Sequence, residues 1–276
     1  MLPFPDMDPT LIEIGPLKLR WYGLAYALGF IAAYILISIQ QKARGIGLKG
    51  ERLQALIFFL AVGLVIGARL GYILFYHFAQ LGEYIVHPLE IIAVWHGGMS
   101  FHGGLIGAVV SAVFFCRRHH MPFWDVADAV IVTAPIGLAL GRLGNFINGE
   151  LYGRPTHVPW AMVFPGTTQM PRHPSQLYEA LLEGVLLFIL LWNLKDAGFR
   201  PGAMVCCFLG GYGAFRFLVE FFRQPDAQLG LFFGVLSMGQ MLCLLMVIAA
   251  LVLWWVLPRG ARGNDGINSS KLEADL

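Results

Sequence analysis

Charged residues are scarce in this sequence, and their scarcity excludes several classes of protein. Of its 276 residues, 13% are charged and 57% are hydrophobic, and the mean hydropathy is +0.66. An ordinary soluble domain carries more charge and less apolar surface, so the composition predicts a polytopic membrane protein. The net charge of +2 is too small to indicate a nucleic-acid partner.

Potential metal ligands are also few. The four cysteines stand in apolar stretches, without the spacing of a metal site or of a disulfide framework, and are expected to be buried packing residues: Cys116, Cys206, Cys207 and Cys243. The histidines have no metal-ligand spacing on a shared helix face, and no cluster of carboxylates suits a divalent cation. We therefore expect a site without a metal and without a cofactor.

Long apolar runs are what the sequence has most of. Seven of them approach the ~20 residues that a helix needs to cross the hydrocarbon core, at about 20–40, 53–76, 95–116, 125–142, 176–194, 202–222 and 236–257. The fourth run is interrupted by Pro135. The segment 80–94 contains Pro88 and Glu90 and is expected to lie at the membrane interface. The fold class predicted is an all-α bundle of seven transmembrane helices.

The distribution of Lys and Arg predicts how these spans are oriented. Eleven of them lie in the first, third and fifth loops and in the C-terminal tail, and five lie on the opposite side. By the positive-inside rule, the N-terminus is outside and the C-terminus is in the cytoplasm. We expect one transmembrane domain over residues 1–259 and a disordered cytoplasmic tail at 260–276. The proline-rich segment 145–175 predicts a small periplasmic cap with short strands.

Polar residues within the spans converge on one leaflet. Placed at 1.5 Å per helical residue, they fall in the outer half of the bilayer: Tyr22, Arg69, His102, Arg142, Glu179, Glu183, Tyr212, Arg216 and Glu220. A charge at membrane depth costs roughly 2.5–3.5 kcal/mol on insertion scales, so these residues require partners or a function.

Three of these residues share one helix face, because Tyr212, Arg216 and Glu220 are spaced i, i+4, i+8. This trio suits either a ligand site or a structural ion pair between helices. The glutamates at 179 and 183 are expected to be structural, or counter-charges to an arginine. Arg69 is equally well explained as a structural partner of one of those glutamates.

The most polar stretch at membrane depth is 141–153, which reads Gly-Arg-Leu-Gly-Asn-Phe-Ile-Asn-Gly-Glu-Leu-Tyr-Gly. Asparagine and glycine are poor helix formers, so the helix is expected to unwind here and to expose backbone N–H groups. Those donors together with Arg142 make an anion site. The alternative is a helix end followed by a polar loop.

The arginines and one histidine suggest the chemistry. Arginine matches phosphate oxygens bidentately, and the phosphate-bearing ligand of a membrane is a phospholipid. His102 stands among glycines that allow a close approach, and a reference pKa of about 6.5 suits proton transfer. The alternative for His102 is a structural, hydrogen-bonded role. The residues alone thus predict a membrane protein that handles phospholipid.

Five motifs, in the same order along the chain, resemble those of the bacterial prolipoprotein diacylglyceryl transferase family. They are Trp-Tyr-Gly at 21–23, His-Gly-Gly-Leu-Ile-Gly at 102–107, the stretch 141–153 quoted above, Arg-His-Pro-Ser-Gln-Leu-Tyr-Glu at 172–179 and Glu-Phe-Phe-Arg-Gln-Pro-Asp at 220–226. The similarity covers roughly residues 9–255, nearly the whole chain.

The resemblance implies a multi-pass enzyme of the bacterial inner membrane whose active site faces the periplasm. Its reaction would move the diacylglyceryl group of phosphatidylglycerol to the lipobox cysteine of a prolipoprotein signal peptide, with membrane lipids around it. The positions that it makes functionally sensitive are Tyr22, His102, Arg142, Asn145, Glu150, Gly153, Arg216 and Glu220; Tyr212 joins the lipid-binding set through its helix face.

The mechanism expected from the resemblance uses His102 as the base for the thiol. Arg142 and Arg216 stabilise the leaving phosphate, while Tyr22, Asn145 and the backbone near Gly153 orient the substrates. In the alternative, His102 only orients a substrate, and Glu220 or Glu150 takes the proton.

Other functions predict different patterns. A transporter or flippase would show internal repeats and polar residues at the midplane or through both leaflets, and neither is visible. A transferase of the CDP-alcohol type needs a spaced set of aspartates for metal, which Asp125 and Asp128 do not form. A lipid-binding or assembly protein without catalysis would give His102 no chemical role.

Overall fold

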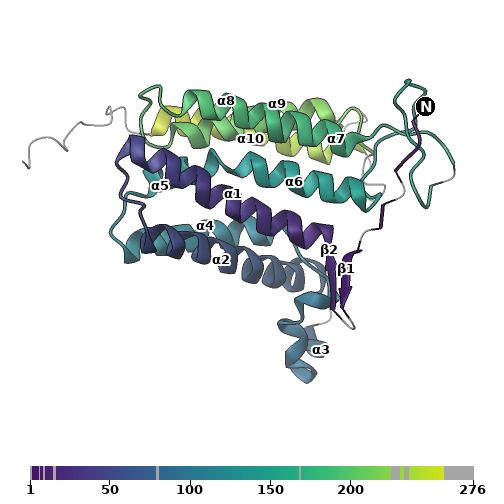
Figure 1. The fold of residues 1–276 in the computed structure, drawn as a ribbon, viewed down its shortest axis with the longest axis horizontal. Helices are drawn as coiled ribbons and strands as arrows, with labels where there is room; N and C mark the ends of the chain where they lie inside the picture. The colour runs from purple at the N-terminus through teal and green to yellow at the C-terminus, as the bar shows by residue number, and fades with distance from the viewer. Residues whose placement is uncertain are drawn as a thin grey trace, which may run out of the picture. The chain divides into compact units, whose positions relative to one another are not determined.

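Most of the chain that the computed structural model describes is helical (Figure 1). The structure describes residues 2–5, 7–8, 10–14, 17–78, 81–167, 169–224, 231–232 and 236–257. The predicted disordered tail at 260–276 lies outside these residues. Two compact units are distinguished, one of Met1–Ala32 with Asp128–Leu276 and one of Ala33–Ala127. The prediction of a single transmembrane domain over 1–259 stays a prediction.

The helices account for most of the apolar runs. The longer ones are α1 (Trp21–Arg44), α2 (Glu51–Tyr76), α4 (Phe101–Arg118), α5 (Phe123–Ile131), α6 (Ala134–Ile147), α9 (Ala203–Val219) and α10 (Met238–Val256). Another helix runs through α7 (Ser175–Glu179), the π-helical η4 (Ala180–Leu186) and α8 (Leu187–Leu194).

Short elements fill the ends of the helices. They are α3 (Leu81–Val86), η2 (Pro88–Ile91), η3 (Val94–His96) and two antiparallel pairs, β1 (Thr10–Ile14) with β2 (Leu17–Arg20) and β3 (Leu231–Phe232) with β4 (Leu236–Ser237). The segment 80–94 is thus no membrane span in its described part, as predicted.

Five helical stretches are long and apolar enough to cross a membrane, which makes the chain a multi-pass membrane protein. They are Trp21–Lys42, Glu51–Tyr76, Phe123–Ile147, Ser175–Leu194 and Met238–Val256. Helices α4 and α9 coincide with the third and sixth predicted runs, but among the described residues neither counts as a candidate span of full length. The coarse prediction of membrane helices is confirmed.

One predicted helix start is wrong for an identifiable reason. The third run was expected to be helical from residue 95, whereas α4 begins at Phe101. Gly97 and Gly98 have φ values of 84° and 71°, and Ser100 caps the helix by accepting a hydrogen bond from the Gly103 N–H. The fourth run is divided into α5 and α6 at Val132–Thr133, just before Pro135, where the sequence predicts an interruption.

The second unit is built on the close antiparallel pair α2 and α4. A Cβ atom added to Gly103 would lie 2.3 Å from the carbonyl oxygen of Gly67 and 2.7 Å from the Cα atom of Gly71. The two backbones touch because glycines face each other, as small residues allow between membrane helices. The first turns of α4 are therefore fixed against the second half of α2.

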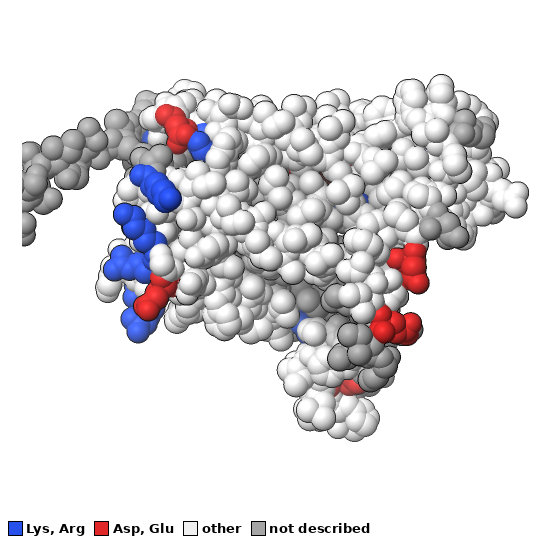
Figure 2. All heavy atoms as spheres, viewed as in Figure 1, with Lys and Arg blue, Asp and Glu red and all other residues white. Residues whose placement is uncertain are grey.

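The opposite end of this helix pair is basic. Arg52 at the start of α2 and Arg117 and Arg118 at the end of α4 are exposed. Figure 2 shows Lys and Arg gathered at helix ends, with few charges on the lateral face. This distribution matches the one from which the orientation is predicted.

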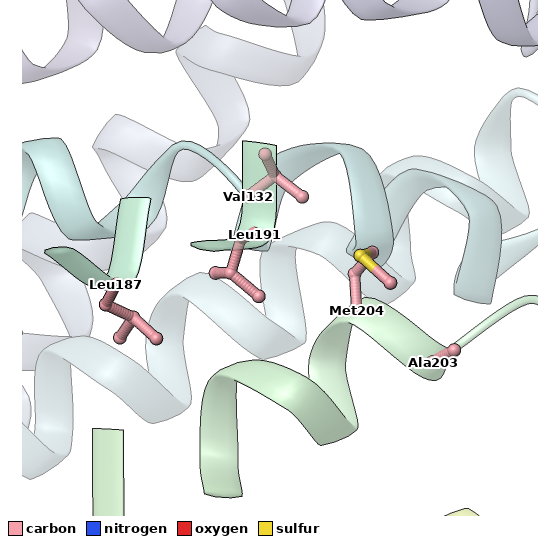
Figure 3. Packing of buried hydrophobic residues seen from close by; sticks show 5 residues of the cluster. All are labelled: Val132, Leu187, Leu191, Ala203 and Met204. Carbon is pink, nitrogen blue, oxygen red and sulfur yellow. The ribbon is translucent and has the colours of Figure 1, made fainter. Parts of the chain in front are cut away.

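The first unit packs its helices around a small apolar cluster. Val132, Leu187, Leu191, Ala203 and Met204 are buried there (Figure 3). Beside it, the buried carboxylate of Asp128 accepts hydrogen bonds from the N–H groups of Gly202 and Val205, at 3.0 and 3.2 Å. These bonds provide acceptors for two of the N–H groups at the start of α9 that have no partner within the helix. The N-cap residue, Gly202, has no side chain that could accept them.

The segment predicted to form a cap folds against the end of α6. Phe146, Met162 and Phe164 form a second buried cluster, with Phe4 and Tyr152 packed on it. The predicted short strands are present only as isolated bridges in the described part of this segment, such as Pro155 with Arg172 and Gly153 with Arg223.

Candidate active site

Arg216 lies at the centre of a buried group of charges in the first unit. Its side chain projects from α9, is 8% exposed, and is surrounded by three carboxylates. Nη1 lies 3.4 Å from Glu179 and 3.7 Å from Glu183, and Nη2 lies 2.9 Å from Glu220. Of the two readings of Arg216 and Glu220, the ion pair is present in the structure, and Glu179 and Glu183 lie as counter-charges to the same arginine. Together with Arg142, these residues are called the arginine–glutamate cluster below.

Arg142 enters the cluster from α6 in a different way. Its Nε atom lies 2.8 Å from Glu179 Oε2, the same oxygen that contacts Arg216, and its side chain remains 20% exposed. Within the described residues, no ion pair or hydrogen bond engages its two terminal nitrogens. Glu179 therefore orients the guanidinium while leaving its outer edge available to an anion.

The cluster contains more carboxylates than guanidiniums, three against two. The side chains of Glu179 and Glu183 are 0% exposed, and Glu183 has ion-pair contact but no hydrogen bond to its oxygens. Buried charges require partners because desolvation is costly. Glu183 also lies in the π-helical stretch η4. π-Helical turns are rare in proteins, and those that occur are often found at functional sites.

Glu220 is held by the beginning of α10. Its Oε1 atom accepts a hydrogen bond of 3.0 Å from Ser237 Oγ, and Ser237 forms a capping box with Gln240. A Cβ atom at Gly239 would lie 2.7 Å from the same carboxylate. Sequence reasoning missed Ser237, although the pattern Ser-x-x-Gln before an apolar run indicates a helix start.

The polar turn after α6 is closed by hydrogen bonds to Glu150. The amides of Asn145 and Asn148 both donate to Glu150 Oε1, at 2.8 and 3.2 Å, and Gln176 donates to its backbone carbonyl at 2.6 Å. The helix continues through Ile147, so the predicted unwinding occurs five residues after Arg142. The structure thus brings Asn145 and Glu150 together; Gln176 is a further residue that sequence reasoning missed.

Gly153 is enclosed by the cap. Its N–H donates to the backbone carbonyl of His173 at 2.9 Å, and its own carbonyl accepts from Arg172 Nη1 at 3.1 Å. A Cβ atom there would lie 2.5 Å from the carbonyl oxygen of Phe222 and 2.7 Å from His173 Cβ. Burial lowers the pKa of the His173 imidazole from its ordinary value. Only glycine fits this junction of three backbone segments.

The two predicted tyrosines occupy different places. Tyr22 lies in the first turn of α1 with its ring against Gly144, where an added Cβ would meet Tyr22 Cδ2 at 2.9 Å. The ring of Tyr212 stacks on Phe208 at 5.7 Å, one helical turn before Arg216. Tyr22 is thereby in contact with the polar stretch 141–153.

His102 belongs to the second unit and is exposed in the first turn of α4. Its neighbours Ser100 and Gly103 are buried. In the same unit, Arg69 binds backbone carbonyls rather than a glutamate side chain, so its proposed pairing with a glutamate is wrong. Among the residues that the structure describes, no three His, Cys, Asp or Glu side chains are grouped to hold a metal ion.

Comparison with known proteins gives one consistent result. Residues 9–256 match the family model described as prolipoprotein diacylglyceryl transferase. A phosphatidylglycerol–prolipoprotein diacylglyceryl transferase of Geobacter sulfurreducens is 52% identical over 250 residues, covering 91% of this chain and 95% of the relative. Proteins of the same name from Coxiella burnetii and Vibrio vulnificus are 52% and 50% identical, over 92% and 94% of this chain and 97% and 95% of their own length. The chain therefore belongs to the prolipoprotein diacylglyceryl transferase family.

Proposed function

We propose that this chain carries out its family's reaction with the arginine–glutamate cluster and His102. The reaction transfers the diacylglyceryl group from phosphatidylglycerol to the cysteine thiol of a prolipoprotein, the first step of bacterial lipoprotein maturation. The observation that supports this assignment is the partial burial of Arg142 and its single ion-pair contact through Nε in the described structure. Its guanidinium is partly buried and oriented through Nε, and its terminal nitrogens remain available for a phosphate.

The chemical step is an alkyl transfer. A thiol has a reference pKa of about 8.5 and reacts as the thiolate, so His102 accepts its proton. The sulfur attacks the glyceryl carbon bonded to the phosphate oxygen, a C–S bond forms, and the C–O bond breaks. The electron pair of that bond leaves with glycerol phosphate, whose additional negative charge Arg142 stabilises in a site of low dielectric constant.

The other residues hold the reacting groups in place. Arg216 is already enclosed by three carboxylates, so its part is to fix Glu179 and thereby Arg142. Tyr22 and Asn145 orient the headgroup beside it, and Tyr212 borders the lipid. Glu150 supports Asn145 through a hydrogen bond, and Gly153 joins this turn to the cap.

The choice of base has one remaining alternative. Both oxygens of Glu220 are already engaged, by Arg216 and by Ser237, which makes it a poor proton acceptor. Glu150 is exposed and is the better alternative to His102. A histidine has the more suitable reference pKa, and His102 lies in one of the family motifs.

The membrane setting follows from the distribution of charge. We place seven helices across the bacterial inner membrane, with the N-terminus outside, the C-terminus in the cytoplasm and the active site facing the periplasm. Exposed basic residues at the start of α2 and the end of α4 support this orientation. Phosphatidylglycerol and the lipobox-bearing signal peptide then enter from the outer leaflet.

Release of glycerol phosphate tests the proposal. Purified protein in detergent is given phosphatidylglycerol and a peptide with a Leu-Ala-Gly-Cys lipobox, and a Cys→Ser peptide is the control. Arg142→Lys should lower kcat about 10²–10³-fold, the usual cost of removing one stabilising donor, while Arg117→Lys at the exposed end of α4 should not. His102→Gln should lower it about 10²–10⁴-fold. Release that does not need the thiol would refute the transfer, and full activity of His102→Gln would refute its role as base.

A further inference from the structure

Arg69, in the second unit, uses every nitrogen of its guanidinium in hydrogen bonds. It is 6% exposed, and its guanidinium donates to four backbone carbonyls. Nε donates to Ile91 at 3.1 Å and Nη2 to Glu90, while Nη1 donates to Gly97 and Gly98 at 2.8 and 3.1 Å. Within the part of the chain that the structure describes, this buried charge binds carbonyls and no carboxylate, which requires an explanation.

The carbonyls are those at the ends of two short helices. Glu90 and Ile91 close η2, and Gly97 is the C-cap residue of η3. The last carbonyls of a helix have no partner within it and favour a nearby cation. Arg69 therefore joins the two short helices to each other and to α2 through the carbonyls at their ends.

The chain from Gly97 leads directly to His102. Gly98, at φ 71°, packs so tightly that an added Cβ would lie 2.5 Å from the ring of Tyr72 and 2.8 Å from Arg69 Nη1. Two residues later, the Ser100 N–H donates to the carbonyl of Ala68, the neighbour of Arg69, at 2.9 Å. The backbone on both sides of His102 is thus attached to α2, through Ser100 and through the glycine contact at Gly103.

We infer that Arg69 is a positioning residue for His102: by fixing the segment 90–98 on α2, it sets where the first turn of α4 places the imidazole. The inference rests on the proposed role of His102 and assigns Arg69 a part in turnover without contact with substrate. Without Arg69, the first turn of α4 would keep its attachments at Ser100 and Gly103 but lose the support of segment 90–98, and a displacement of the imidazole by about 1 Å can cost roughly 10²-fold in rate.

Hydrogen exchange of the intact chain in detergent tests the structural half. Arg69→Gln removes both the charge and the planar guanidinium with its several N–H donors. Arg69→Lys keeps the charge, but one ammonium group cannot reach all four carbonyls. Both should speed amide exchange in segment 90–104, with no change in α10. The matched control is Arg52→Gln, an exposed arginine on the same helix. Unchanged exchange at 90–104 in folded Arg69→Lys would overturn the inference.

Kinetics test the functional half. Arg69→Lys should lower kcat about 10–100-fold while KM for phosphatidylglycerol stays within about 2-fold. In the double variant with His102→Gln, the losses should not multiply, because a displaced base and an absent base cost the same step. A raised KM with unchanged kcat, or losses that multiply, would overturn the inference. A fully active His102→Gln would instead overturn the proposed role of His102, and the positioning role with it.

Discussion

Glu179→Gln is the substitution that most directly tests the arginine–glutamate cluster. The change keeps the shape of the side chain and removes one negative charge from a position that is 0% exposed. That charge is shared by two arginines, at 2.8 and 3.4 Å from one oxygen. Glutamine keeps one acceptor oxygen, but the N–H groups of its amide would face the N–H groups of the two arginines. Arg142 then lacks its ion-pair partner.

The expected loss is about 3–5 kcal/mol in the free energy of unfolding, the usual cost of removing one partner from a buried ion pair. An exposed pair would lose only about 0–1 kcal/mol. The assay is unfolding by sodium dodecyl sulfate in mixed micelles, followed by fluorescence of the seven tryptophans. Glu51→Gln, exposed at the start of α2, is the control. A loss below about 1 kcal/mol for Glu179→Gln would refute the view that these charges are desolvated and mutually dependent.

Three further predictions concern the packing and the cap. Gly103→Ala should destabilise the chain by about 1–3 kcal/mol, because its Cβ would meet the backbone of α2, whereas Gly137→Ala meets no atom within 4 Å and should not; the same unfolding assay compares them. Gly153→Ala should open the cap, which limited proteolysis at 154–170 would detect as faster cleavage than in the parent chain. Because burial lowers the pKa of the His173 imidazole in the folded protein, the unfolded chain binds a proton at this histidine more readily. The free energy of unfolding should therefore fall as the pH drops through 6.5. His173→Gln should reduce this pH dependence between about pH 8 and pH 5, and an unchanged pH dependence would contradict the burial of the imidazole.

Much of the fold follows from local sequence signals. The apolar runs predict the helices because a bilayer requires continuous hydrophobic stretches, and the break between α5 and α6 follows from Pro135. The late start of α4 was also signalled, by the pair Gly97 and Gly98 and by the capping residue Ser100. The apolar run therefore begins before the helix does, and the start of the helix is set by these local signals.

The candidate site was predictable only in part, because spacing along one helix says nothing about partners on another. The i, i+4 spacing of Arg216 and Glu220 was visible in the sequence, where an ion pair was one of two readings, and the structure places the two side chains in contact. The convergence of Glu179 and Glu183 on that arginine depends on how η4 packs beside α9, and a π-helical stretch has no local signature. Likewise, nothing local distinguishes an arginine that binds backbone carbonyls, such as Arg69, from one that binds a carboxylate.

The buried charges also bear on the order in which the membrane helices assemble during synthesis. Arg142 emerges first, in α6, and finds its partner only when α7 brings Glu179. Glu183 enters with the same helix, but its only arginine within ion-pair distance in the described chain is Arg216 on α9. Each unpaired charge opposes release of its helix into lipid by roughly 2.5–3.5 kcal/mol. The spans from α6 to α9 are therefore expected to leave the insertion machinery as a group, and a chain truncated before α9 should be recognised as incomplete by membrane quality control.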